Sequence, residues 1–309
     1  MPLPYDLTLI AGPTAAGKSA LALAYAVRHN GAIINADASQ IYNALPILTA
    51  QPTEVDRVRV PHDLYGVLAP DQTCSVGRWV DLAVAAVGAA RSAGHHPVVV
   101  GGTGLYLNAL VRGLSAMPAI DPVVRDRARA LQQKMGNPAF HAELARIDPA
   151  MAARLRATDT QRLIRAYEVM IATRTSLAVW QDAPRMPPLG GQTIYKVLIA
   201  PPRDALRARA RARLDHMIVD GVLDEITAFL ARIDQGTMPA DAPVTKALGF
   251  APLADVARGT LPLSGGLEAA FLQTAHYIKR QQTWFRHQMV FDQTIIDPNI
   301  TEITLGTIK

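Results

Sequence analysis

Short apolar runs alternate with longer amphipathic stretches in the N-terminal part of the chain. The runs at residues 7–11, 32–36 and 97–100 are short and apolar enough to be buried strands. Residues 20–27 and 77–93 place their apolar positions at helical spacing. Fully apolar strands that alternate with helices are typical of a parallel sheet covered on both faces. The pattern therefore predicts an α/β core.

This alternation stops at residue 115, where prolines begin to separate short helical stretches. Residues 115–188 carry 11 Arg and Lys against seven Asp and Glu. Strand character returns at residues 197–200, so the sheet resumes beyond this segment. We therefore predict an α/β core formed by residues 1–114 and 192–309, interrupted by an all-helical insertion at residues 115–191.

A helix predicted at residues 203–219 carries Arg209 and Arg213 one turn apart. Such a pair suits either a diphosphate contact or a solvated surface, and the pattern does not decide between them. Pro-punctuated residues 45–52 and 60–65 are predicted to be loop and edge strand.

The last long helix is predicted at residues 266–289. Its apolar stripe has Gln282 as the one polar member and otherwise consists of Phe271, Ala275, Ile278, Phe285 and Met289. The opposite face carries Arg280, Trp284 and His287. A Trp away from the core and beside basic side chains is the pattern for stacking on a base or for docking another domain.

A phosphate-binding motif follows the first predicted strand. The segment Gly12-Pro13-Thr14-Ala15-Ala16-Gly17-Lys18-Ser19 fits the pattern G-x-x-x-x-G-K-[ST] without a mismatch, between a strand and a helix as required. Its glycines allow a tight turn with inward N–H groups, and the helix adds the positive end of its dipole. Lys18 supplies a positive charge and Ser19 a hydroxyl that can hold Mg²⁺. The alternative is a chance match in an apolar, Gly-rich turn.

Two further strand ends carry polar groups. The second predicted strand leads into Asp37, which suits either a helix N-cap or a group that holds magnesium indirectly, through its bound water. The strand at residues 97–100 leads into Gly101-Gly102-Thr103-Gly104, where P-loop ATPases and GTPases usually carry an acidic magnesium ligand. A hydroxyl and exposed backbone at that point favour close approach of a ligand over activation of water.

Composition narrows the class of protein. The net charge is +5, and 25 of the 31 basic residues are Arg. Arg suits phosphate contacts and base stacking, so the bias favours a nucleic-acid partner, although GC-rich coding bias explains it equally well. The single cysteine, Cys74, excludes an internal disulfide and a cysteine metal cluster. We see no membrane span or signal peptide, and we expect a cytoplasmic location.

Taken together, the motifs resemble those of the tRNA dimethylallyltransferase (tRNA isopentenyltransferase) family over nearly the whole chain. The matching segments are residues 12–19, residues 37–42, Tyr65, residues 75–77, Val100-Gly101-Gly102-Thr103-Gly104-Leu105-Tyr106, residues 159–165 and Lys279-Arg280-Gln281-Gln282-Thr283-Trp284-Phe285-Arg286. The phosphate motif alone is generic, whereas the Gly-Gly-Thr-x-Leu-Tyr and Lys-Arg-Gln-x-Thr-Trp-x-Arg segments, in this order and at this spacing, are specific. The resemblance implies a P-loop NTPase-like fold.

The resemblance also implies a reaction: transfer of a dimethylallyl group from dimethylallyl diphosphate to N6 of the adenosine 3′ of the anticodon, in tRNAs that read codons beginning with U. Gly12 to Ser19 would bind the diphosphate with Mg²⁺, which Ser19 would hold directly or through water. Arg213 would assist from the opposite side, Asp37 would be the general base, and Thr103 would line the reaction channel. The implied tRNA contacts are Asp37, Ala38, Ser39, Gln40, Thr103, Arg125, Gln161, Arg162, Leu163, Ile164, Arg165, Lys279, Arg280, Gln281, Gln282, Thr283, Trp284, Phe285 and Arg286.

The implied partners are the anticodon stem-loop and dimethylallyl diphosphate, with no membrane, and we expect a monomer. The sequence departs from the family pattern at Ala38, Leu48 and Gln51, where the family usually has Ser, Gly and Lys. Three other functions remain open on residues alone: a small-molecule P-loop kinase, an adenylate isopentenyltransferase, and a non-catalytic RNA-binding module.

Overall fold

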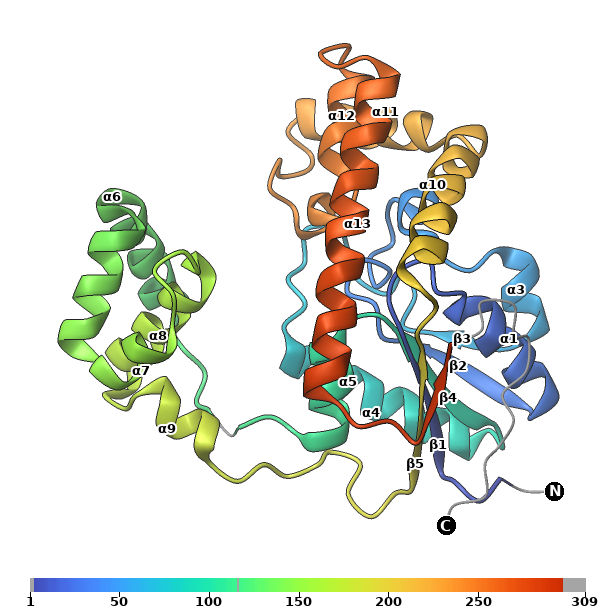
Figure 1. The fold of residues 1–309 in the computed structure, drawn as a ribbon, viewed down its shortest axis with the longest axis horizontal. Coiled ribbons are helices and arrows are strands. Elements are labelled where there is room, and N and C mark those ends of the chain that lie inside the picture. Colours follow the sequence, from blue (N-terminus) through green and yellow to red (C-terminus); the bar gives the residue numbers. More distant parts are fainter. Residues whose placement is uncertain (1–2, 116, 297–309) are drawn as a thin grey trace. The chain divides into compact units, whose positions relative to one another are not determined.

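The computed structural model describes residues 3–115 and 117–296. They fold into two units, each described separately below (Figure 1). The core unit comprises the described parts of Met1–Val111 and Pro188–Lys309, and the helical unit is Arg112–Pro187. The sequence pattern placed these boundaries a few residues later, near residues 115 and 191.

A single parallel sheet forms the centre of the core unit, with the strand order β3-β2-β4-β1-β5-β6. Its strands are β1 (Leu7–Ala11), β2 (Gly31–Asn35), β3 (His62–Asp63), β4 (His96–Gly101), β5 (Ile194–Ile199) and β6 (Gln293–Ile295). Every residue of β1 and β2 is buried, including Thr8 and Asn35, the polar members of their otherwise apolar runs. The predicted α/β class with a parallel sheet flanked by helices is confirmed.

The helices of the core unit include all those that the apolar spacing predicted. They are α1 (Lys18–Arg28), α2 (Pro46–Thr49), α3 (Glu54–Arg59), α4 (Val76–Ser92), α5 (Gly104–Arg112), α10 (Arg203–Val219), α11 (Val222–Asp234), α12 (Phe250–Ala257) and α13 (Leu263–Gln288), with a 3₁₀ turn at Pro243–Lys246. Among them, α2 forms within residues 45–52, which were predicted to be loop and edge strand. Residues 60–65 do contain the edge strand β3, and α3 lies between these two stretches. A capping box at Thr53 and Asp56 starts α3 and overrides the proline punctuation around it.

The apolar stripe of α13 is buried at all five predicted apolar positions. Its polar member, however, is Gln281 and not Gln282. Gln281 is 5% exposed, whereas Gln282 is only partly covered. Three-residue and four-residue steps alternate along a helical stripe, so the spacing from Ile278 fits either position, and the prediction chose the wrong one.

The helical unit consists of α6 (Pro122–Ile147), α7 (Pro149–Arg154), α8 (Thr160–Thr173) and α9 (Leu177–Asp182). It has a hydrophobic core of its own, in which Phe140, Leu144 and Leu163 are fully buried. Helix α6 breaks at Gly136, whose φ of 72° and ψ of 165° are open to glycine but strained for other residues.

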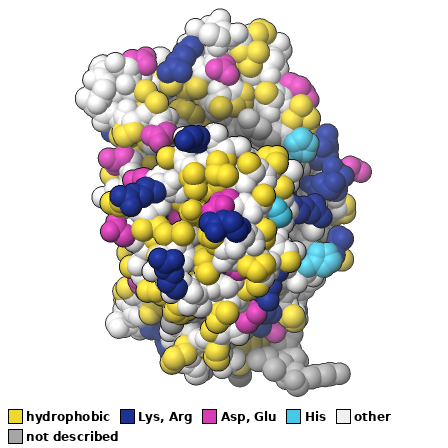
Figure 2. Space-filling model, turned by 90° about the vertical axis from the view of Figure 1, so that its left-hand side faces the viewer, with side chains coloured by type: hydrophobic (Ala, Val, Ile, Leu, Met, Phe, Trp, Pro, Cys, Tyr) yellow, Lys and Arg dark blue, Asp and Glu magenta, His cyan; other side chains and the backbone are white. Residues whose placement is uncertain are grey.

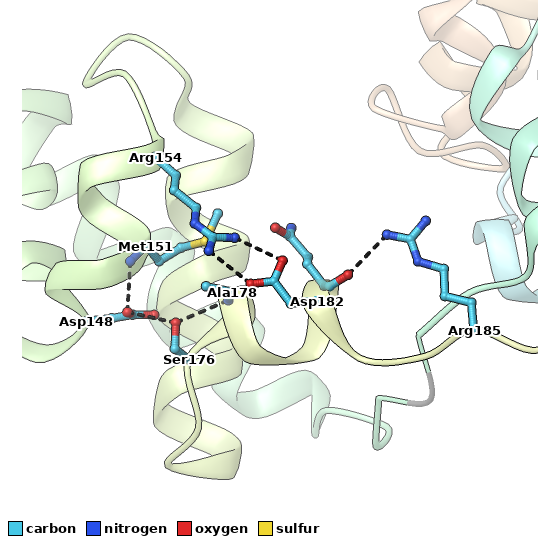
Figure 3. Close-up of polar contacts among 8 residues, drawn as sticks. Asp148, Met151, Arg154, Ser176, Ala178, Asp182 and Arg185 are labelled. Atoms are coloured by element: carbon cyan, nitrogen blue, oxygen red, sulfur yellow. Dashed lines mark hydrogen bonds and ion pairs between the residues drawn. The ribbon is translucent and has the colours of Figure 1, made fainter. Parts of the chain in front are cut away.

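A buried carboxylate joins two helix starts in the helical unit (Figure 3). Asp148 Oδ1 accepts hydrogen bonds from Met151 N at the start of α7, at 3.0 Å, and from Ser176 Oγ, at 2.9 Å. Ser176 Oγ accepts in turn from Ala178 N at the start of α9, at 3.1 Å. The two short helices are thereby fixed at their N-termini, and Arg154 pairs with Asp182 on the surface beside them. Over the described residues, no helix is both long and apolar enough to span a bilayer.

Candidate active site

The predicted phosphate loop lies between β1 and α1, at the carboxyl edge of the sheet. Gly17 has a φ of 91° and Ala15 a φ of 64°, so both lie in the left-handed region. For Ala15, which has a side chain, this conformation costs about 1–2 kcal/mol. Lys18 Nζ donates to Pro13 O at 2.7 Å and closes the loop on itself. Although Lys18 as a residue is only partly covered, its amino group is enclosed. Burial lowers the Lys18 pKa to about 8, with Asp37 opposing and Arg213 reinforcing the shift.

Gln281 of α13 ties this loop to the next strand end. Its Oε1 accepts from Thr14 N at 2.8 Å, and its Nε2 donates to Gly102 O at 2.8 Å. A side chain at Gly102 would collide with the Gln281 carboxamide. The carboxamide of Gln281 is therefore committed inside the protein, which corrects its expected role as a tRNA contact.

Asp37 follows β2 and is held through its backbone. Asn35, which is fully buried, accepts from Asp37 N at 2.8 Å and donates to Asp37 O at 3.0 Å. Asp37 Oδ1 accepts from Ser39 N at 3.0 Å and from Ser39 Oγ at 2.7 Å. Among the described residues nothing hydrogen-bonds Oδ2, which is therefore available to a ligand.

Two sequence-based expectations about Asp37 change as a result. No helix begins after it, because residues 38–41 form a turn, so the N-cap alternative is wrong. Ala38 leaves out the hydroxyl usual at that position, but Ser39 places a hydroxyl on the same carboxylate.

Thr103 lies beside Asp37 and near Tyr277, a residue that the sequence did not indicate. Thr103 Oγ1 accepts from Ala38 N at 3.0 Å, and its backbone N donates to Ala36 O at 3.2 Å. The side chains of Thr103 and Tyr277 lie near each other, and Thr103 acts to lower the Tyr277 pKa. Burial, with a contribution from the charge of Asp37, raises the Tyr277 pKa to about 12, so its hydroxyl stays protonated at neutral pH. Tyr277 lies one turn before Gln281 on α13, and that spacing is the signal that could have identified it.

Arg209 and Arg213 of α10 are turned toward the phosphate loop. Arg209 Nη1 donates to Ala16 O at 3.4 Å, and Arg213 Nη2 donates to Thr49 O at 3.5 Å. Burial lowers the pKa of the Arg213 guanidinium, and Asp37 opposes the shift. This arrangement favours the diphosphate interpretation of the pair over the solvated one.

The α2 segment that receives Arg213 is fixed from two sides. Glu225 accepts from Ile47 N at 2.8 Å and from Leu48 N at 2.9 Å, at the start of α2. Gln40 Nε2 donates to Thr49 O at 2.9 Å and to Ala50 O at 2.7 Å. Gln40 therefore has a structural role in addition to the contact predicted for it.

The outward face of α13 carries four of the remaining predicted contacts of this helix, namely Lys279, Arg280, Thr283 and Trp284. An open pocket along it is lined by His276, Lys279, Arg280, Thr283, Trp284, His287 and Gln288. The ring of Trp284 packs on Gly104, where any side chain would collide with it, so one edge of the ring is already covered. Phe285 is 2% exposed and belongs to the core, so its side chain cannot be a direct tRNA contact as expected.

The predicted contacts of the insertion form a second group, within the helical unit. Gln161, Arg162 and Ile164 are at least partly exposed on α8, whereas Leu163 is fully buried in the core and is corrected as a direct contact. Arg125 of α6 and Arg165 of α8 both pair with the same carboxylate, that of Glu168.

The residues around the loop fit a magnesium ion bound mainly by its ligand. Ser19 is exposed at the start of α1, where its hydroxyl is accessible. No cluster of three or more His, Cys, Asp or Glu side chains suited to a metal occurs within residues 3–115 and 117–296. A hard cation with one protein hydroxyl would take its other oxygens from a diphosphate and water, which is the usual environment of Mg²⁺ beside phosphates.

Over the middle of the face drawn in Figure 2, basic side chains are scattered among hydrophobic and acidic ones, and several others gather beside histidines along its right-hand edge. They do not form one unbroken patch there. Charge alone therefore does not locate a nucleic-acid site on this face, and such a site has to be identified from individual side chains.

Comparison with known proteins identifies the family. Residues 40–288 match the family model described as IPP transferase. A tRNA dimethylallyltransferase of Rhodospirillum centenum is 47% identical over 290 residues, covering 94% of this chain and 91% of that protein. The crystal structure of the tRNA isopentenylpyrophosphate transferase of Bacillus halodurans has a TM-score of 0.64 at 30% identity, covering 95% of this chain and 90% of that one.

A eukaryotic dimethylallyltransferase captured acting on tRNA has a TM-score of 0.74 over 90% of this chain and 69% of that one. At 23% identity this likeness supports the fold alone. The family model and the bacterial relatives, together with the Lys18, Asp37, Thr103 and Arg213 cluster, settle the assignment. This chain belongs to the IPP transferase family.

Proposed function

We propose that this protein is a tRNA dimethylallyltransferase, which moves a dimethylallyl group from dimethylallyl diphosphate to N6 of the adenosine 3′ of the anticodon. The observation that carries the proposal is the convergence of the phosphate loop, Asp37, Thr103 and Arg213 on one edge of the sheet. Family membership and the activity named for close relatives support the reaction class. The loop then holds a leaving group and not a nucleotide to be hydrolysed.

The diphosphate binds where positive groups converge. Loop N–H groups and the start of α1 face it, Lys18 and Arg213 supply charge, and Arg209 approaches the loop from α10. As the bond between the allylic carbon and the diphosphate oxygen breaks, the electron pair leaves with the diphosphate. These preorganised charges stabilise the developing anion, an effect worth about 3–4 kcal/mol for a single donor in comparable sites.

Asp37 is the proposed general base. The lone pair of N6 forms the new bond to the allylic carbon, and the proton released from N6 passes to Asp37 Oδ2. Ser39 and Asn35 hold the carboxylate and its backbone in place for this transfer. Thr103 and Tyr277 line the same side, and a flipped adenine would meet their hydroxyls.

Mg²⁺ is the proposed cofactor, with Ser19 as its protein ligand. When bound, the ion neutralises charge on the diphosphate and so improves the leaving group. The anticodon stem-loop is the proposed partner of the α13 outward face and of the exposed arginines of the helical unit. We further propose a cytoplasmic monomer.

A labelled-donor assay tests the function. Dimethylallyl diphosphate carrying a radiolabel in its allyl group is offered with Mg²⁺ to unmodified tRNA, to an anticodon stem-loop and to AMP. Label is expected in both RNAs and absent from AMP, and varying the bases beside the target adenosine defines the sequence requirement. Label in AMP alone would identify an adenylate enzyme instead. Phosphoryl transfer from ATP, with no prenyl transfer, would identify a kinase.

A further inference from the structure

A buried carboxylate in the helical unit has no role in the chemistry above. Glu168 of α8 is 4% exposed. Its Oε2 lies 3.2 Å from Arg165 Nη1, and its Oε1 lies 3.7 Å from Arg125 Nε. One carboxylate oxygen thus forms an ion pair with an arginine on the same helix, and the other forms an ion pair with an arginine on α6.

Both arginines keep donors toward solvent. Their side chains are 41% exposed for Arg125 and 39% for Arg165. Arg165 Nη2 also contacts Met117 Sδ at 3.4 Å. Within the described residues, the terminal nitrogens of Arg125 have no hydrogen-bond partner. Together Arg125, Arg165 and Glu168 carry a net charge of +1, with the carboxylate buried and the two guanidinium groups partly exposed to solvent.

Stability alone does not account for this arrangement. A buried ion pair often stabilises a protein no more than apolar side chains of similar volume would. An unrestrained arginine, by contrast, loses about 2 kcal/mol of side-chain conformational entropy when a ligand fixes it. A carboxylate beneath two arginines removes much of that loss before the ligand arrives.

We propose that Glu168 is a positioning residue, which orients Arg125 and Arg165 as a paired guanidinium site for one phosphate of the RNA. The proposal rests on the proposed function for the identity of the RNA. Two guanidiniums held on one carboxylate keep their remaining N–H donors close together, and guanidinium donors suit the oxygens of a phosphate. The pair accordingly contributes register and affinity on the tRNA, and Glu168 acts through the pair without touching the RNA.

The proposal makes an unusual prediction of sign. Replacing Glu168 by Gln removes a negative charge, and charge alone predicts tighter binding to a polyanion. Loss of positioning predicts weaker binding. The two effects oppose each other, so the direction of the change is informative in itself.

The experiment compares Glu168→Gln with Glu143→Gln in the full-length enzyme. Glu143 makes the matched control because it pairs with Arg146 on α6 in the same unit, outside the predicted contacts. Binding to the anticodon stem-loop is measured against salt concentration, with steady-state transfer and thermal unfolding in parallel. For Glu168→Gln we expect about five- to eightfold weaker binding near 0.1 M salt and a salt slope smaller by about 0.7–0.9, as for one lost phosphate contact.

Steady-state kinetic constants distinguish a loss of arginine positioning from a general loss of structure. The KM for tRNA should rise, whereas kcat and the KM for dimethylallyl diphosphate should stay unchanged. Glu168→Gln should add nothing in an Arg125→Ala/Arg165→Ala background. Should Glu168→Gln fail to fold, Glu168→Asp keeps the charge but shortens its reach, and the same weakening and smaller slope are expected.

Equal or tighter RNA binding by a folded Glu168 variant, with an unchanged salt slope, overturns the proposal. A loss of affinity equal to that of Glu143→Gln overturns it as well. The proposed function is tested independently, because it is overturned only if the wild-type enzyme transfers no label to tRNA.

Discussion

At the scale of single residues, the candidate site is a small cluster of coupled charges. Asp37 raises the pKa of Lys18, while burial and Arg213 lower it. The same carboxylate opposes the lowering of the Arg213 pKa and contributes to the raised pKa of Tyr277. Any substitution of Asp37 therefore changes the electrostatics of the whole cluster as well as removing the proposed base.

Replacing Asp37 by Ala should abolish transfer. A general base contributes about 10²–10⁴-fold in rate, so we expect a loss of at least this size. Binding of the anticodon stem-loop, measured by filter retention, should stay within a few-fold of wild type because most of the proposed contacts lie elsewhere. Normal turnover by the variant would remove Asp37 from the mechanism.

The lowered Lys18 pKa predicts a pH dependence of diphosphate binding. Lys18 is protonated below pH 8 and loses its charge as pH rises through its pKa of about 8. The affinity advantage of wild type over Lys18→Ala should therefore be largest below pH 8 and shrink by about tenfold per pH unit above it. Calorimetric titration of inorganic diphosphate into both proteins from pH 7 to 9.5 checks this. A constant ratio across that range would contradict the assignment.

Tyr277→Phe should slow transfer while leaving the fold intact. The substitution removes the hydroxyl near Thr103 but keeps the ring, whose centroid lies 5.4 Å from the Arg280 guanidinium carbon. The loss of one neutral hydrogen-bonding group predicts a fall in kcat of about 3–10-fold. A Thr103→Val partner completes a double-mutant cycle, and additive effects would show that the two hydroxyls do not act together.

Sequence reasoning placed correctly those residues that lie together in the chain or at strand ends. The loop from Gly12 to Ser19 is contiguous, and Asp37 and Thr103 follow strands that a parallel sheet brings to one edge. It failed where tertiary contact decides the role of a side chain. The helical stripe marks Phe285 as buried, against the contact that the resemblance implies, but nothing local marks Leu163 as buried within an otherwise exposed motif.

At the scale of elements, α13 presents two functional faces. Its outward face carries Lys279, Arg280 and Trp284, whereas its inward face sends Gln281 between the phosphate loop and the Gly-Gly-Thr turn. The periodic pattern predicted both faces but assigned the glutamine one residue too late. A helical period of 3.6 leaves that ambiguity whenever two glutamines are adjacent.

Gln281→Leu should loosen the phosphate loop. It leaves the Thr14 N–H and the Gly102 carbonyl without their partner, at a cost of about 1–3 kcal/mol for each buried group. We expect a lower melting temperature and a raised KM for dimethylallyl diphosphate. Gln282→Leu is the matched control, one position along the same helix, and should change neither. Equal effects of the two substitutions would mean that the bridge has no function.

At the scale of the whole molecule, the α/β class and the helical insertion follow from the change in apolar spacing. The sequence pattern did not predict α11, α12 or β6, because the burial of their apolar residues depends on the elements packed against them. Nor could it yield the strand order, in which β5 pairs with β1 although the insertion separates them in the chain.

That strand order has a consequence for synthesis on the ribosome. β1 ends at Ala11, and its partner β5 begins only at Ile194. At ~5–20 residues per second, roughly 10–40 s pass before β5 emerges to pair with β1. During that time one side of β1 is an open edge that can pair with other chains. The helical unit is made within the same interval and contributes to the delay, so that edge of β1 needs cover until about two thirds of the chain has been translated.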